Sequence, residues 1–241
     1  MNSKIDLYLI NGPLGAGKTT VIRKLIKDAK FKKSRIIENE FANISIDTDR
    51  FHDHESEIKT IAGLCVCCST GNELIDTLKS LADSKDPVIL EATGVANSLA
   101  IIEKIAPSEV FAKYNVAQSI FVIEAPIFDI NSVKIYIEEM LAADIVLLTK
   151  SDLVPKSKLD KIFTLAKKNN IANFQVANNG DFDHSMMRSK SHIVEFYANI
   201  NGDLRKHDSD MNYTVIDLHS NLNQSAIKQA WPKIANDFGL R

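Results

Sequence analysis

Short apolar runs alternate with longer amphipathic segments along most of the chain. The runs predict strands, which cover residues 5–10, 34–38, 86–90, 119–123, 145–148 and 173–176. Apolar residues at helical spacing predict helices over residues 21–26, 72–82, 98–105, 128–142 and 156–169. A repeated strand–loop–helix order is typical of a mostly parallel sheet with helices on both faces, so the pattern predicts an α/β fold.

The pattern weakens at two places. Residues 48–60 are polar and rich in acids, which predicts a solvated loop even though His52 and His54 lie within it. Composition shifts after residue 178, and the polar tail carries few signals before a predicted strand at 213–218 and a predicted helix at 223–238. We therefore expect one domain over residues 1–180 and a short C-terminal appendage over residues 181–241.

The turn after the first predicted strand has the sequence Gly-Pro-Leu-Gly-Ala-Gly-Lys-Thr-Thr. It matches the phosphate-binding loop G-x-x-x-x-G-K-[ST], in the strand–loop–helix setting that this motif requires. Glycines let successive backbone N–H groups point at an anion, and the helix N-terminus adds partial positive charge. Lys18 can reach the β- and γ-phosphates, and the Thr19 hydroxyl can ligate Mg²⁺. The motif predicts a three-layer P-loop NTPase whose phosphate-binding residues are Gly12, Gly15, Ala16, Gly17, Lys18, Thr19 and Thr20.

Acidic residues follow two of the predicted strands, at the edge where ligands gather in parallel sheets. Glu91 ends an apolar strand and precedes Gly94, an arrangement in which P-loop proteins place a Mg²⁺-linked acid and a loop that senses the γ-phosphate. Glu40 and Asp47 lie in a segment that orders or relaxes with nucleotide state in many P-loop GTPases. Both could equally be surface carboxylates. The candidate catalytic residues are Lys18, Thr19, Glu40, Asp47 and Glu91.

The strand predicted at residues 145–148 leads into Thr-Lys-Ser-Asp, which matches the guanine-recognition motif [NT]-K-x-D. The carboxylate of Asp152 can accept two hydrogen bonds from guanine, whereas adenine lacks both donors and would leave a buried carboxylate unpaired. The stem of Lys150 can pack on the base plane, and Ala177 can cover the base edge. Together with Thr149, these residues predict that the nucleotide is GTP or GDP.

All three cysteines lie within four positions, as Cys65, Cys67 and Cys68. Such close thiols in a cytosolic protein favour soft-metal binding or redox chemistry over a disulfide scaffold. Three sulfurs leave one position of a tetrahedral zinc site open, and Glu40, a loop histidine, water or a partner protein could fill it. The alternative is a set of small buried hydrophobic side chains. The density of the cluster favours the metal site.

Charge and hydropathy exclude other classes of protein. The chain of 241 residues has a net charge of −2 and 45% hydrophobic residues, so we expect a folded protein that binds neither nucleic acid nor membranes. We expect no signal peptide, because the N-terminal residues lack its pattern, and no apolar run approaches the ~18 residues of a membrane span. The predicted localisation is cytoplasmic.

Taken together, these motifs resemble the CobW-type metallochaperone GTPases, relatives of the GTPases that insert nickel into hydrogenase and urease. The resemblance covers roughly residues 4–178. It rests on segments that occur in the family's order, at residues 12–20, 39–41, 65–68, 91–94 and 149–152.

The resemblance implies a slowly hydrolysing GTPase that carries Zn²⁺, or Co²⁺ or Ni²⁺, to a client metalloprotein. In that picture Cys65, Cys67 and Cys68 hold the transferable metal with Glu40 nearby, metal binding depends on nucleotide state, and a homodimer forms with GTP. Two alternatives stay open. One is a GTP-dependent activator of a corrinoid enzyme or other metalloenzyme, and the other is a nucleotide-gated metal sensor without turnover.

Overall fold

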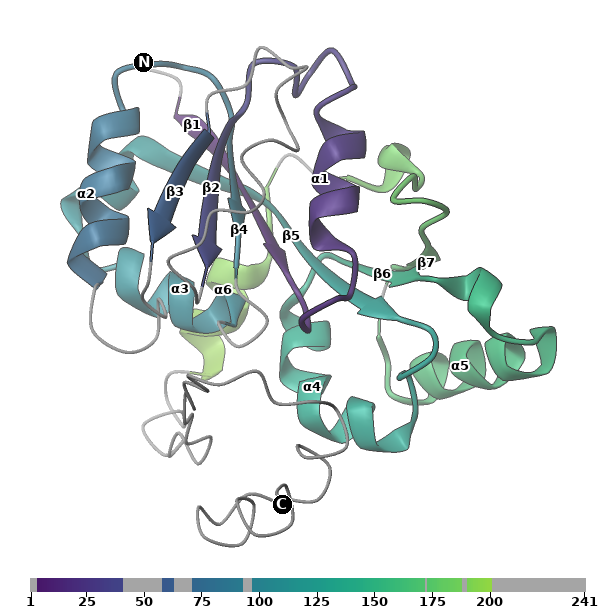
Figure 1. The fold of residues 1–241 in the computed structure, drawn as a ribbon. Helices are drawn as coiled ribbons and strands as arrows, with labels where there is room; N and C mark the ends of the chain where they lie inside the picture. Colours follow the sequence, from purple (N-terminus) through teal and green to yellow (C-terminus); the bar gives the residue numbers. More distant parts are fainter. Residues whose placement is uncertain are drawn as a thin grey trace, which may run out of the picture. The chain divides into compact units, whose positions relative to one another are not determined.

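The computed structural model describes residues 4–40, 58–62, 71–92, 97–171, 173–187 and 190–200, and a seven-stranded sheet runs through them. The strand order is β3-β2-β4-β1-β5-β6-β7, and every pairing along it is parallel. The strands are β1 (Ile5–Asn11), β2 (Arg35–Glu40), β3 (Ile58–Ala62), β4 (Val88–Glu91), β5 (Tyr114–Glu124), β6 (Ile145–Thr149) and β7 (Phe174–Val176). Because all pairs are parallel, the carboxyl ends of the strands point toward one edge of the sheet, as β1, β2 and β3 do in Figure 1.

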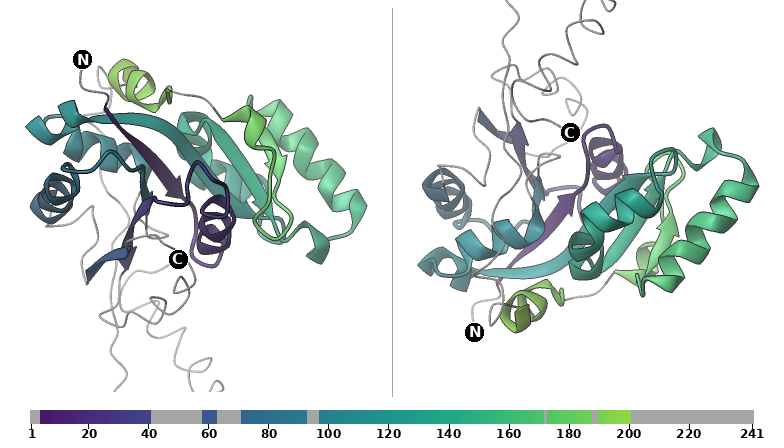
Figure 2. Two further views of the ribbon diagram at one scale, coloured as in Figure 1. Left: turned by 90° about the horizontal axis from the view of Figure 1, so that it is seen from above. Right: turned by 90° about the horizontal axis from the view of Figure 1, so that it is seen from below.

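Helices pack on both faces of this sheet. Leu7 and Leu9 of β1 belong to an apolar cluster with α2, α3 and α6, whereas Tyr8 and Ile10 pack with α1 on the other face. Both views in Figure 2 show α1 and α6 on opposite sides of β1. A third cluster joins β5 and β6 to α4 and α5. The helices are α1 (Lys18–Leu25), α2 (Gly71–Leu81), α3 (Ser98–Ile105), α4 (Ile130–Ala142), α5 (Lys156–Lys168) and α6 (Ile193–Ile200), with 3-10 turns η2 (Glu109–Lys113), η3 (Ser151–Leu153) and η4 (His184–Met186). The predicted three-layer α/β fold is confirmed.

The starts of α3 and α4 are set by side-chain caps. The side-chain Oδ1 of Asn97 accepts a hydrogen bond of 2.5 Å from the Ala100 N–H. Asp129 accepts from the Ser132 N–H while the Ser132 hydroxyl accepts from the Asp129 N–H, which is a reciprocal capping box. By contrast, α1 follows Gly17 without a side-chain cap, so its first N–H groups are available to an anion.

Two elements differ from the sequence-based expectation. Residues 58–62 were expected to belong partly to a solvated loop, yet they form β3 because β2 offers them a parallel partner from Ile36 to Glu40. The tail was expected to be polar up to residue 212, yet it contains α6, which packs against α3, α4 and β5 and whose Ile193 is fully buried. The predicted strand at 213–218 and helix at 223–238 lie outside the described residues, and the boundary at residue 180 stays a prediction.

Among the described helices, none combines the length and apolar character needed to cross a bilayer.

Candidate nucleotide-binding site

The phosphate loop begins where β1 ends. Gly12 has a φ of 143°, and a Cβ at this position would lie 1.9 Å from the carbonyl oxygen of Val122 on the neighbouring β5. Only glycine therefore fits, because any side chain would collide with the backbone of the adjacent strand. The chain then curls back, with a hydrogen bond of 3.2 Å from the Ala16 N–H to the Pro13 carbonyl, and enters α1 at Lys18.

The ammonium group of Lys18 lies inside this loop. It donates hydrogen bonds of 3.0 and 3.1 Å to the carbonyls of Gly12 and Pro13. Burial lowers the pKa of Lys18, and the carboxylate of Glu91 opposes that shift. A buried cation enclosed by backbone at the start of an uncapped helix is suited to neutralising a polyphosphate.

Thr19 and Glu91 bring a hydroxyl and a carboxylate together. The Thr19 Oγ1 lies 3.2 Å from each carboxylate oxygen of Glu91, since α1 starts beside the carboxyl end of β4. Mg²⁺ prefers hard oxygen ligands and is commonly bound by one or two protein oxygens together with substrate phosphates. These two side chains therefore fit the predicted Mg²⁺, which Thr19 and Glu91 would hold against the nucleotide.

The predicted guanine-recognition segment adjoins the phosphate loop directly. The hydroxyl of Thr149, the last residue of β6, donates a hydrogen bond of 2.6 Å to the Ala16 carbonyl. Lys150 takes a left-handed conformation with a φ of 52° and pairs its ammonium with the carboxylate of Glu124, at the end of β5. Asp152 is exposed and free to meet a ligand from solvent, and the backbone of Ala177 is fixed to Leu148 by a hydrogen bond of 2.9 Å. The structure thus brings Thr149, Lys150 and Ala177 to the same edge as the phosphate loop.

Several predicted site residues lie outside the described part of the chain. Glu40 ends β2, but nothing is described of its side chain. The remaining ones are Asp47, Cys65, Cys67, Cys68 and Gly94. Within the described ranges, no group of three or more His, Cys, Asp and Glu side chains could hold a metal ion.

The sequence analysis missed residues that flank the predicted site. Asn11 and Glu139 are joined by a hydrogen bond of 2.5 Å beside the phosphate loop, and Glu124 pairs with Lys150. An acidic residue at the carboxyl end of β5 could have drawn attention to Glu124. Nothing in the sequence links positions 11 and 139, because their contact depends on how α4 packs.

The parallel sheet with its loop between β1 and α1 defines a P-loop nucleotide-binding protein. The family model of the CobW/HypB/UreG nucleotide-binding domain matches residues 6–175. The chain belongs to this family.

Relatives with assigned roles match the same region. The zinc chaperone YjiA of Escherichia coli is 34% identical over an alignment of 194 residues, which covers 76% of this chain and 60% of that protein. The zinc chaperone CobW of a Sinorhizobium species is 26% identical over 192 residues, covering 66% of this chain and 54% of that protein. The chain therefore spans between 54% and 60% of the length of these curated relatives.

Solved structures share the fold. The Zn(II)-bound YjiA GTPase from E. coli has a TM-score of 0.53 at 24% identity, covering 78% of this chain and 62% of that chain. HypB from Helicobacter pylori in complex with nickel has a TM-score of 0.54 at 18% identity, covering 87% of this chain and 92% of that chain.

Proposed function

We propose that this chain is the nucleotide-binding part of a GTP-dependent metallochaperone that hydrolyses GTP to GDP and phosphate. The observation that carries the proposal is the convergence of Lys18, Thr19 and Glu91 beside a segment with the guanine-recognition motif, whose Thr149 contacts the phosphate loop. Family membership and relatives named as zinc chaperones support the metal-carrying part.

Each residue has a role that follows from its place. The loop N–H groups and the Lys18 ammonium bind and orient the phosphates, and Asp152 selects guanine through its exposed carboxylate. Thr19 and Glu91 hold Mg²⁺, which when bound neutralises charge on the phosphates. In the attack of water on the γ-phosphate, this arrangement stabilises charge and aligns the reacting groups. Glu40 and Asp47 remain the candidates for the residue that orients the attacking water.

The metal is cargo in this proposal. The candidate ligands Cys65, Cys67 and Cys68 fall in the sequence between β3, which ends at Ala62, and α2, which begins at Gly71. The strands β3 and β1 belong to the same parallel sheet, so the carboxyl end of β3 and the phosphate loop after β1 lie at the same edge of that sheet. In this proposal, a change of nucleotide at the phosphate loop alters metal binding at the same edge.

Asp152→Asn tests the nucleotide assignment. An amide at this position cannot accept the two guanine donors but can donate to the 2-carbonyl of xanthine, so binding should shift from GTP to XTP. We expect GTP affinity to fall by at least ~100-fold and XTP affinity to rise, since unpaired polar groups in a base pocket discriminate strongly. Asp160→Asn, the same change at an exposed site on α5, should alter neither. Unchanged GTP binding in Asp152→Asn would remove guanine recognition by this motif.

A zinc titration against a competing chelator tests the cargo. The wild type and a Cys65/Cys67/Cys68→Ser variant are compared with a non-hydrolysable GTP analogue and with GDP. Cysteine-dependent zinc binding that weakens in GDP supports a GTP-driven carrier. Equal zinc binding by the variant removes the metal role of the cysteines. Cysteine-dependent binding without any GTP hydrolysis, with or without zinc, replaces the carrier by a metal sensor.

A further inference from the structure

A carboxyl group on α4 lies between the phosphate loop and the start of α3. The Glu139 Oε2 accepts a hydrogen bond of 2.5 Å from the Asn11 side-chain amide and one of 3.1 Å from the Ser98 N–H. The Asn11 Oδ1 in turn accepts a hydrogen bond of 2.6 Å from the Gly12 N–H. Segments far apart in the sequence therefore meet on one side chain.

Both segments held by Glu139 are continuous with the proposed nucleotide site. Asn11 is the last residue of β1 and directly precedes the phosphate loop. Ser98 is the first residue of α3, at the end of the connection that begins after Glu91, and the Glu91 carboxylate lies against Thr19. A shift of the Glu139 carboxyl would therefore act on both the start of the phosphate loop and the first residue of α3.

We infer that Glu139 is a positioning residue that couples the phosphate loop, through Asn11, to the start of α3, through the Ser98 N–H. The inference rests on the proposed function in one respect, because it gives this coupling a part in distinguishing GTP from GDP. The Glu139 side chain itself touches neither nucleotide nor metal in this role.

The other oxygen of this carboxyl, Oε1, differs from Oε2 in its hydrogen bonding. Oε1 is shielded from solvent and has no hydrogen-bond partner within the described ranges. Among the described residues, the carboxyl is therefore held through Oε2 alone. The strength of these two hydrogen bonds depends on whether the carboxyl is charged.

The protonation state supplies that change. Burial raises the pKa of Glu139 to about 7, against the opposing hydrogen bonds from Ser98 and Asn11, and the neighbouring Glu138 carboxylate raises it further. From the β1 side the Asn11 side-chain amide faces the group, and from α3 the Ser98 N–H does. The carboxylate accepts charge-assisted hydrogen bonds from Asn11 and Ser98, whereas the neutral acid accepts weaker ones.

Glu139→Leu and Glu139→Gln separate coupling from simple packing. Leucine removes both accepted hydrogen bonds, while glutamine keeps an accepting oxygen and resembles the neutral acid. Glu103→Gln, on the exposed face of α3, is the matched control. We expect Glu139→Leu to lower the ratio of GTP-analogue to GDP affinity by about tenfold, a typical coupling factor between sites. Glutamine should retain most of the ratio, and the wild-type ratio should rise with pH around 7 while that of Glu139→Gln stays flat.

Amide hydrogen exchange of the nucleotide-free protein gives a readout that does not need GTP. In Glu139→Leu the Gly12 and Ser98 amides should both exchange about tenfold faster, because each loses a constraint on its segment. Asn11→Ala should speed the same two amides, and the double variant should exchange no faster than either single variant. The β6 amides report whether the fold is intact.

The outcomes distinguish this inference from the proposed function. Faster exchange at both amides in a wild-type background that binds no guanine nucleotide supports the coupling and removes the GTPase assignment. Unchanged exchange at both amides overturns the coupling, whatever the GTPase activity. Faster exchange with an unchanged GTP-to-GDP affinity ratio, in a protein that binds both, reduces Glu139 to a structural contact and overturns its positioning role.

Discussion

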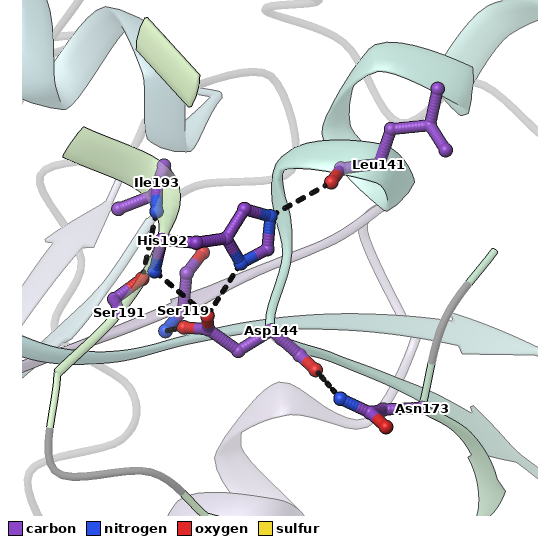
Figure 3. Close-up of polar contacts among 7 residues, drawn as sticks. All are labelled: Ser119, Leu141, Asp144, Asn173, Ser191, His192 and Ile193. Carbon is purple, nitrogen blue, oxygen red and sulfur yellow. Dashed lines mark hydrogen bonds and ion pairs between the residues drawn. The ribbon is translucent and has the colours of Figure 1, made fainter. Parts of the chain in front are cut away.

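Two buried carboxyl groups near the end of α4 hold their surroundings in different ways. Glu139 lies within the helix and Asp144 directly precedes β6. Both oxygens of Asp144 are paired, as Figure 3 shows. Oδ2 accepts a hydrogen bond of 2.7 Å from the Ser119 N–H. Oδ1 accepts a hydrogen bond of 3.0 Å from the His192 backbone N–H and lies 2.7 Å from the Nδ1 of the same residue. In Glu139 only Oε2 is paired, and Oε1 has no hydrogen-bond partner among the residues that the structure describes.

The surroundings of Asp144 show what full pairing achieves. The other ring nitrogen of His192, Nε2, lies 3.1 Å from the backbone carbonyl oxygen of Leu141. The side-chain amide of Asn173 donates a hydrogen bond of 2.8 Å to the backbone carbonyl of Asp144. One residue therefore ties the end of α4, the start of β7 and the start of α6 to the sheet. A carboxylate that is paired at both oxygens stabilises the fold in its charged form. A buried carboxyl that is paired at one oxygen loses fewer hydrogen bonds when it takes up a proton. The comparison predicts opposite signs when the two charges are removed.

Asp144→Ala should give the largest effect on stability. It leaves the Ser119 N–H and both His192 donors without their acceptor, and removing one partner of a buried charged contact costs about 3–5 kcal/mol. Urea unfolding should show this loss, while Asp160→Ala on the exposed face of α5 should change stability by less than ~0.5 kcal/mol. A loss below that of ordinary surface variants would show that the paired carboxylate is dispensable.

Glu139→Gln should have the opposite sign. The pKa of Glu139 is raised from 4.5 to about 7 in the fold, so the folded protein keeps a proton that the unfolded chain releases between these values. The resulting destabilisation is absent below pH 4.5 and complete above pH 7, and glutamine removes it. We expect the variant to gain on the order of 1–3 kcal/mol over the wild type at pH 8.

Unfolding at several pH values between 4.5 and 8 measures this difference. The gain of Glu139→Gln should grow as the pH rises, and Glu103→Gln should show no such trend. A difference that is constant across the range would contradict a raised pKa at Glu139.

His192→Ala should give the smallest effect. It removes one donor from Asp144 and the contact with Leu141 but keeps the backbone hydrogen bond to the carboxylate, so we expect a loss of ~1–2 kcal/mol. Amide exchange should localise the change to α6. His184→Ala, whose ring lies 3.4 Å from the Asp28 carboxylate near the surface, is the comparison and should cost less. If the two histidine variants behave alike, the attachment of α6 does not depend on the imidazole.

The fold was largely predictable because local signals agreed with one another. The run before Gly12, the glycine-rich turn and the apolar face of α1 all specify the same strand–loop–helix unit. Strand β3 was not predicted because the sequence from Ile58 to Ala62 has only a weak strand pattern and forms a strand through pairing with β2. Helix α6 was not predicted because a polar stretch precedes it, and its burial depends on contact with α3, α4 and β5.

In the candidate site, too, the residues within short motifs were predictable, whereas those brought together by tertiary packing were not. Lys18, Thr19 and Glu91 were predictable because each belongs to a short motif with a known strand–loop setting. The Asn11–Glu139–Ser98 network was not, since its members are distant in sequence and meet only when α3 and α4 pack beside β1. Motifs report local chemistry, and tertiary packing decides which buried groups act on it.

The turn after β7 has a consequence for how this edge of the sheet is attached to α1. Asn178 and Asp181 exchange backbone hydrogen bonds of 2.9 Å, and a Cβ on Gly180 between them would lie 2.6 Å from the Thr20 carbonyl in the first turn of α1. The turn and the Thr149–Ala16 hydrogen bond therefore attach the β6–β7 edge of the sheet to the phosphate loop and to α1 at two separate points. Any side chain at position 180 would collide with the α1 backbone and should loosen one of these two attachments.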